Sequence, residues 1–167
     1  MYLLKKIKHS NVIRLLEVFE SSKHMLMVME YAGGGDLLHL IKRKGKLQES
    51  DAKFIFKQIS YGLAHIHCRS VIHRDIKLDN ILIEDKTNMI KVIDFGFSVI
   101  CSSQKLKIFC GTPSYMAPEI VQKKEYDGRA VDMWALGVLL YTMLTGTFPF
   151  RGISESDLYY KIQRGNF

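Results

Sequence analysis

Apolar residues fall in short runs at the start of this chain and at helical spacing over most of the remainder. Residues 12–20 and 24–31 are short apolar runs rich in valine, leucine and methionine, with a polar stretch between them. Residues 81–84 and 89–94 form a second such pair around another polar stretch. Runs of this length bounded by turn residues predict β-strands, so we expect two hairpins.

Helical spacing governs most of the remaining chain. The clearest case is residues 48–67, whose first turn is acidic, as suits the helix dipole. Its apolar positions recur at helical spacing at Ala52, Ile55, Ile59, Leu63 and Ile66. The same criteria predict the end of an amphipathic helix in residues 2–9, a short helix at 37–44, an apolar helix near 131–145 and a last helix within 154–165.

Three consecutive glycines, Gly33 to Gly35, separate the strand-rich start from the helix-rich remainder. Asp36 follows them directly and is a suitable cap for the short helix after it. Residues 96–118 show no sustained period and are expected to be mostly loop. We therefore predict an α+β fold in two unequal parts, residues 1–30 and residues 31–167.

Composition narrows the class of protein. The 167 residues are 47% hydrophobic and 25% charged, as in globular domains, and three separate cysteines are expected to stay reduced. The formal charge of +7 is spread along the chain, which favours a solvated basic surface and no nucleic-acid partner. The most apolar run, residues 131–144, is too short to span a bilayer, and the N-terminal residues do not resemble a signal peptide. We expect a cytoplasmic protein without a membrane partner, with the nucleus as a second compartment.

Four short motifs occur in a fixed order along the chain. They are HRDIKLDN at residues 73–80, DFG at 94–96, APE at 117–119 and DMWALG at 132–137. An acid, a lysine, a second acid and an amide within a few positions suit phosphoryl transfer, which depends on positioning and charge neutralisation. Each motif alone is a weak signal. The ordered set resembles the catalytic domain of protein kinases, and the resemblance covers essentially all of the chain.

This resemblance implies a two-lobed kinase fold, in which the strand-rich part ends the small β lobe and the remainder forms the hinge and most of the helical large lobe. It also implies transfer of the γ-phosphate of ATP to a hydroxyl group of a protein substrate. Asp75 matches the catalytic base that accepts the hydroxyl proton, and Lys77 matches the residue that neutralises charge on the moving phosphoryl group. Asn80 and Asp94 match the oxygen ligands of Mg²⁺.

The same resemblance assigns a nucleotide pocket. Met29 takes the gatekeeper position, and Glu30 to Ala32 take that of the hinge, whose backbone groups hydrogen-bond adenine. Leu82 matches the residue packed under the adenine ring. Asp36 is expected to contact the ribose in addition to capping its helix.

Other matched positions support the catalytic loop from within. His73 and Phe95 belong to a column of side chains that is expected to continue through Leu15 to Leu4. Asp132 is expected to hold the backbone of the catalytic loop from below. These roles too are carried over from the resemblance.

Substrate preference follows from the same comparison. Lys77 and Thr112 are similar to the serine/threonine kinase pattern, and several segments resemble the calcium/calmodulin-dependent and AMP-activated-like group. Asp36 and Asp79 match acidic positions that bind an arginine three residues before the target hydroxyl in some relatives, and an arginine–carboxylate pair suits that task. Helix capping by Asp36 without a substrate role is an equal alternative.

The chain also departs from the family pattern. The glycine-rich loop and the strand lysine are expected upstream of residue 1. The last helices of the large lobe are expected beyond residue 167, and with them the arginine that normally pairs with Glu119. Oligomeric state is left open.

A further departure concerns activation. The usual activating phosphothreonine position is Ile108, so Arg74 lacks the phosphate that it normally binds. We expect no control by phosphorylation at position 108. Ser102 and Ser103 are alternative sites, whereas Thr112 is expected to be a structural contact of the catalytic loop.

Two rival functions stand beside the kinase hypothesis. A truncated, inactive pseudokinase would act as a binding scaffold, although the intact catalytic motifs argue against it. A zinc site could be imagined in HIHCRSVIH, residues 65–73, but its spacing fits no standard zinc site.

Overall fold

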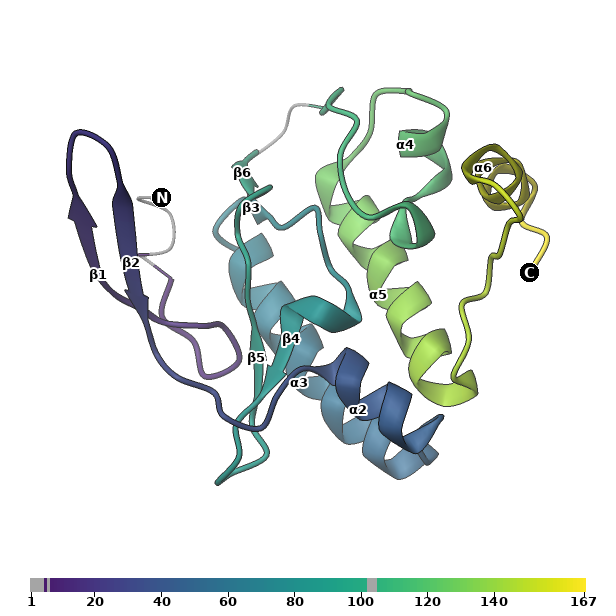
Figure 1. The fold of residues 1–167 in the computed structure, drawn as a ribbon. Coiled ribbons are helices and arrows are strands. Elements are labelled where there is room, and N and C mark those ends of the chain that lie inside the picture. The colour runs from purple at the N-terminus through teal and green to yellow at the C-terminus, as the bar shows by residue number, and fades with distance from the viewer. Residues whose placement is uncertain (1–4, 6, 102–104) are drawn as a thin grey trace.

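The computed structural model describes residues 5, 7–101 and 105–167, and it consists of a two-stranded hairpin beside a mainly helical body (Figure 1). The strands are β1 (Leu15–Glu20), β2 (Met25–Met29), β3 (Val71–Ile72), β4 (Ile81–Ile83), β5 (Ile90–Val92) and β6 (Val99–Ile100). The α-helices are α2 (Leu37–Lys44), α3 (Glu49–His67), α4 (Pro118–Val121), α5 (Gly128–Thr145) and α6 (Glu155–Arg164). Short 3₁₀ turns cover Leu78–Asn80 and Pro113–Tyr115.

The two predicted hairpins are confirmed. β1 pairs antiparallel with β2, with a shift of register between Leu15 and Glu17, and β4 pairs antiparallel with β5. A third pair, β3 with β6, was not predicted, so the segment 96–118 is not all loop. Each of these two strands has only two residues, which is too short for any alternation to be recognised in the sequence.

The four helices predicted after residue 30 are also confirmed, with differences at their ends. Asp36 caps α2 by accepting a hydrogen bond from the His39 backbone N–H at 2.7 Å. α5 begins at Gly128 rather than near Val131, because the Asp127 carboxylate accepts from the Arg129 N–H and starts the helix earlier. The helix end expected in residues 2–9 falls mostly outside the described residues.

The main core lies where α3 packs beside α5 (Figure 1). Its fully buried side chains include Ile59, Leu63, Ile66, Leu136, Leu139 and Met143. Burial of a large aliphatic side chain is worth about 1.5–3 kcal/mol, so each of these side chains contributes to the stability of the helical body. A second cluster packs α4 and α6 against the start of α5. The two clusters therefore lie under the chain from β3 to α4, which contains the motifs at residues 73–80, 94–96 and 117–119.

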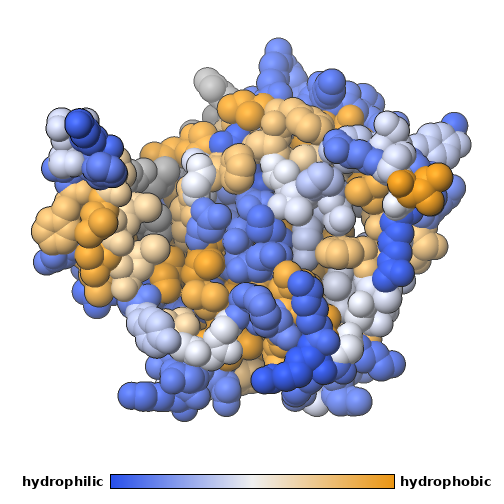
Figure 2. Space-filling view, viewed as in Figure 1, coloured by the Kyte–Doolittle hydropathy of each residue, from blue (hydrophilic) through white to orange (hydrophobic). Residues whose placement is uncertain are grey.

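The β1–β2 hairpin carries many exposed hydrophobic side chains, and Figure 2 shows them at the side of the molecule. It is joined to the body through Ile13 and Leu15, which are buried and pack against Phe95. None of the described helices is both long and apolar enough to cross a membrane.

Gly146 ends α5 in a left-handed conformation, with φ of 77°, directly against the end of α2. A Cβ atom at this position would lie 2.2 Å from the Gly45 carbonyl oxygen. We expect Gly146→Ala to lower the free energy of unfolding by about 2–5 kcal/mol, combining left-handed strain with overpacking. Chemical denaturation measures the loss.

The matched control is Gly165→Ala. Gly165 has a similar φ of 70° at the end of α6, but a Cβ there would meet no atom within 4 Å. Its cost should be the strain alone, about 1–2 kcal/mol. Equal losses in the two variants would contradict the close contact between the ends of α2 and α5.

Candidate active site

The segment 73–80 connects β3 to β4, and α5 fixes its backbone from below. The buried Asp132 carboxylate on α5 accepts hydrogen bonds from the backbone N–H of His73 at 2.9 Å and of Arg74 at 2.8 Å. These bonds hold Arg74 at a positive φ of 67°, which a residue with a side chain rarely adopts. The expected contact of Asp132 with this loop is therefore present.

The Asp75 carboxylate lies at the centre of a small polar cluster and is almost fully buried. Its Oδ2 is 2.8 Å from the Lys77 Nζ and accepts from the Asn80 Nδ2 at 3.0 Å. Its Oδ1 accepts from the Thr112 hydroxyl at 2.8 Å, and Lys77 also donates to that hydroxyl at 3.0 Å. The structure thus brings together Asp75, Lys77, Asn80 and Thr112, and it fixes the orientation of the carboxylate.

Asp94 follows β5 at a positive φ of 61° and is exposed, with its Oδ1 accepting from the Gly96 N–H at 3.1 Å. Asn80 uses its amide nitrogen to donate to the backbone oxygen and the carboxylate of Asp75. The Asn80 Oδ1 is therefore available to coordinate a metal ion. An amide oxygen and a carboxylate on one pocket wall are the hard donors that Mg²⁺ prefers, so these residues fit that ion.

A pocket of about 600 Å³ lies between the hairpin and the body. It is lined by Ile13, Met25, Met27, Met29, Glu30, Asn80, Leu82, Ile93, Asp94, Phe95 and Gly96. Five of the residues assigned from the sequence to the nucleotide and metal sites are thereby brought together: Met29, Glu30, Asn80, Leu82 and Asp94. Ala32 and Asp36 do not line it.

Sequence reasoning missed two lining residues that a strand pattern could have revealed. Met25 and Met27 alternate with Met29 along β2, and residues two apart on a strand point to the same face. This row of methionines gives the pocket a flexible apolar wall.

The expected column of side chains is present as far as the structure describes it. The rings of His73 and Phe95 lie 4.9 Å apart, and Phe95 packs against Leu15. Leu4, the expected end of the column, lies outside the described residues.

Complete burial lowers the pKa of His73 below its ordinary 6.5, although the carboxylates of Asp132, Asp75 and Asp94 act in the opposite direction. The neutral ring fits its contacts, since Nε2 donates to the Ile93 carbonyl oxygen and Nδ1 accepts from the Asp75 N–H. The unfolded chain therefore binds more protons just below pH 6.5. The stabilising contribution is present above that pH and is lost as the pH falls below it.

We accordingly expect the free energy of unfolding to fall between pH 7 and pH 5, by at most about 1.4 kcal/mol per pH unit for this group. Burial lowers the pKa of His9 and His65 too, so they add to the slope. In His73→Asn, the free energy of unfolding should depend less steeply on pH. In His24→Gln, which changes the exposed turn between β1 and β2, the pH dependence should be unchanged. Identical slopes for His73→Asn and the unchanged protein would contradict this assignment.

The loop that carries Ile108 is held by contacts other than a phosphate. Leu106 forms a backbone bridge with Tyr126, whose hydroxyl donates to the Ile108 carbonyl oxygen at 2.9 Å. Arg74 donates from Nε to the Phe97 carbonyl oxygen, and its buried Nη1 has no hydrogen-bond partner in the described part of the chain. The alternative phosphorylation sites, Ser102 and Ser103, lie outside the described residues.

The two acids considered for substrate binding lie on elements that pack together. Asp36 caps α2, and Asp79 is exposed on the turn Leu78–Asn80, which contacts α2. Burial opposes ionisation of Asp36, but its hydrogen bonds from His39 outweigh that effect and hold its pKa below the ordinary 3.8. Asp36 therefore remains charged at neutral pH while it caps its helix.

The side chains of the imagined zinc site are engaged separately. His67 Nε2 pairs with Asp132 at 2.8 Å, and His73 bonds to Ile93. The His65 ring lies tilted against the His9 ring, with their centroids 4.6 Å apart. Within residues 5, 7–101 and 105–167, no three histidine, cysteine or acidic side chains gather as a metal site.

Comparisons with known proteins agree with the class of protein that this fold and site define. The protein kinase domain family matches residues 1–166, and this chain belongs to that family. Members of the family generally use ATP and Mg²⁺.

Three curated relatives are each 42% identical to this chain over nearly all of it. A serine/threonine-protein kinase SIK3 homolog from Danio rerio aligns over 166 residues, 99% of this chain and 14% of the relative. A probable serine/threonine-protein kinase MARK-A from Dictyostelium discoideum aligns over 166 residues, 99% of this chain and 16% of the relative. A putative sperm motility kinase W from Mus musculus aligns over 165 residues, 98% of this chain and 33% of the relative. The chain thus spans a third or less of the length of these relatives.

Proposed function

We propose that this chain is the catalytic part of a serine/threonine protein kinase, which transfers the γ-phosphate of ATP to a protein hydroxyl. The observation that carries the proposal is the cluster around Asp75, in which Lys77 and Thr112 contact the carboxylate within 3 Å. A carboxylate oriented in this way accepts a proton from an incoming hydroxyl, and the ammonium group of Lys77 faces the charge of the transferred group. The 42% identity to named serine/threonine kinases supports this specificity.

Asn80 and Asp94 would hold Mg²⁺, which would neutralise the phosphate charge when bound. In the same proposal Met29 and Leu82 flank the adenine ring, and the backbone of Glu30 to Ala32 binds its edge. Cys68 and Cys110 are free thiols, which fits a reducing compartment such as the cytoplasm. No observation favours the scaffold alternative.

For the protein substrate we propose a basic residue before the target hydroxyl. Its arginine would pair with Asp79, and with Asp36 once the exposed His39 ring is displaced from that carboxylate. Arg74 and Thr112 belong to the regulatory surroundings of the site, with Thr112 as a structural contact.

Equilibrium binding of ATP with and without Mg²⁺ tests the proposed site. Asp94→Asn should weaken binding of ATP in Mg²⁺ but leave binding of adenosine unchanged, because adenosine carries no phosphates for the ion to bridge. Equal binding of ATP by the variant and the unchanged protein in Mg²⁺ would refute the proposed metal ligand.

A further inference from the structure

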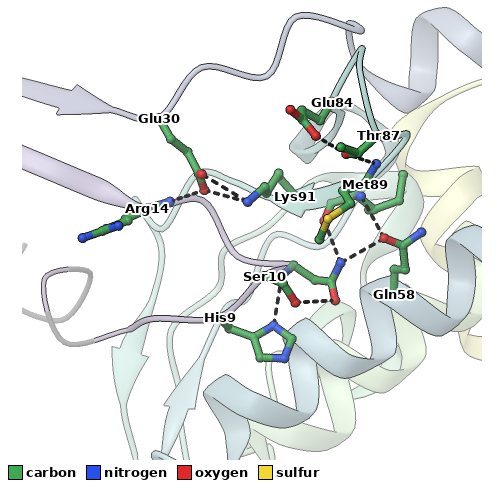
Figure 3. A network of polar contacts seen from close by, with 11 residues as sticks. His9, Ser10, Arg14, Glu30, Gln58, Glu84, Thr87, Met89 and Lys91 are labelled. Carbon is green, nitrogen blue, oxygen red and sulfur yellow. Dashed lines mark hydrogen bonds and ion pairs between the residues drawn. The ribbon is translucent and has the colours of Figure 1, made fainter.

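An ion pair that the sequence did not reveal joins the end of β2 to β5. The Lys91 Nζ donates to both carboxylate oxygens of Glu30, at 3.0 and 3.1 Å (Figure 3). The Lys91 side chain is 13% exposed and that of Glu30 is 28% exposed. The pair is thus largely shielded from water, which makes it stronger than an exposed surface pair.

The Glu30 carboxylate is fixed from a second direction. The Arg14 backbone N–H donates to Glu30 Oε1 at 2.8 Å, and the Glu30 N–H donates to the Arg14 carbonyl oxygen at 3.0 Å. Just before Arg14, the Ile13 N–H donates to the Val92 carbonyl oxygen at 2.9 Å. Contacts therefore run from β5 through residues 13–14 to Glu30 and return to β5 through Lys91. Figure 3 shows the part of this path from Arg14 through Glu30 to Lys91.

This closed set of contacts borders the pocket. Glu30 lines the pocket directly. Lys91 lies opposite Leu82 in the antiparallel β4–β5 register, so the two side chains share one face, and Leu82 also lines the pocket. The ion pair therefore links the β4–β5 floor to the end of the β2 wall.

We propose that Lys91 is a positioning residue that fixes the Glu30 end of the pocket for the adenine ring. This inference rests on the proposed function. Backbone groups recognise a planar ring only if their positions are held within a fraction of an ångström, and a shielded two-oxygen contact supplies such a constraint. Lys91 acts through Glu30 and does not itself contact the nucleotide. Without it, the Glu30 carboxylate keeps only the Arg14 N–H and turns toward water.

The test measures binding of adenosine, which reports on the adenine end of the pocket alone. Lys91→Met removes the charge and keeps the length of the side chain, and we expect adenosine to bind roughly five- to tenfold more weakly. KM for ATP should rise by the same factor while kcat is unchanged. Lys91→Arg should restore both values, because it keeps a cation opposite Glu30.

The matched control is Lys161→Met on α6, which breaks a lysine–carboxylate pair of similar length, 2.9 Å to Asp157, far along the chain from the pocket. It should bind adenosine normally. If Lys91→Met does not fold, Glu30→Gln removes the ionic attraction but can still accept from the Arg14 N–H, and it should weaken adenosine binding. Normal adenosine binding by a folded Lys91→Met variant or by Glu30→Gln would overturn this inference but not the proposed function. A lower kcat at unchanged KM in Lys91→Met would do the same. Failure of the unchanged protein to bind adenosine would overturn the proposed function together with it.

Discussion

Asp75→Asn is expected to lower the rate of phosphoryl transfer by about 10²–10⁴-fold, the usual contribution of a positioned general base. The amide cannot accept the substrate proton, since its oxygen is a far weaker base than the carboxylate. Its oxygen can accept from the donors on one side only, either from Thr112 or from Lys77 and Asn80. The loop should still keep its shape, because Asp132 holds its backbone independently. Steady-state kinetics should therefore show a loss in kcat with little change in KM for ATP.

The control for this substitution is Asp85→Asn, which changes an exposed carboxylate in the turn between β4 and β5. It should transfer phosphate at the normal rate. Near-normal kcat in Asp75→Asn would show that another group accepts the proton, and the assignment of the base would be wrong.

The second large effect concerns stability. Asp132→Ala removes a buried carboxylate that accepts from the backbone of His73 and Arg74 and pairs with His67. Loss of one partner from such a buried group costs about 3–5 kcal/mol. Because Arg74 is held in a strained conformation by these bonds, the catalytic loop should also lose its order. Chemical denaturation should show the lost stability, and phosphoryl transfer should disappear with it.

Asp51→Ala provides the comparison, because Asp51 is half-exposed and pairs with Lys44 only at 3.9 Å. Such surface pairs contribute about 0–1 kcal/mol. If Asp132→Ala were no more destabilising than Asp51→Ala, the support of the catalytic loop by α5 would have to be abandoned.

Local signals were sufficient for much of this fold. The Asp36 cap, the spacing of Ile59 and Leu63 in α3 and the two hairpins all depend on residues a few positions apart, and the structure confirms them. The start of α5 was expected too late because apolar spacing marks only the buried part of a helix. The cap at Asp127 marks its beginning.

Features that depend on distant residues were missed. β3 and β6 stabilise each other only after the helical body has brought them together, and neither has a pattern of its own. Glu30 and Lys91 are 61 positions apart, and nothing in the sequence near either residue indicates the other. Family motifs predicted the grouping around Asp75, but they contain no information on the Met25 and Met27 wall of the pocket.

The most direct test of the proposed activity is transfer of labelled γ-phosphate from ATP to three matched peptides that carry serine, threonine or tyrosine after an arginine. We expect Mg²⁺-dependent labelling of the serine or threonine peptide, no labelling of the tyrosine peptide, and no useful labelling by Asp75→Asn. Labelling of tyrosine would contradict the proposed specificity. Absence of labelling by a folded protein that binds ATP would contradict the claim that the Asp75 cluster transfers phosphate.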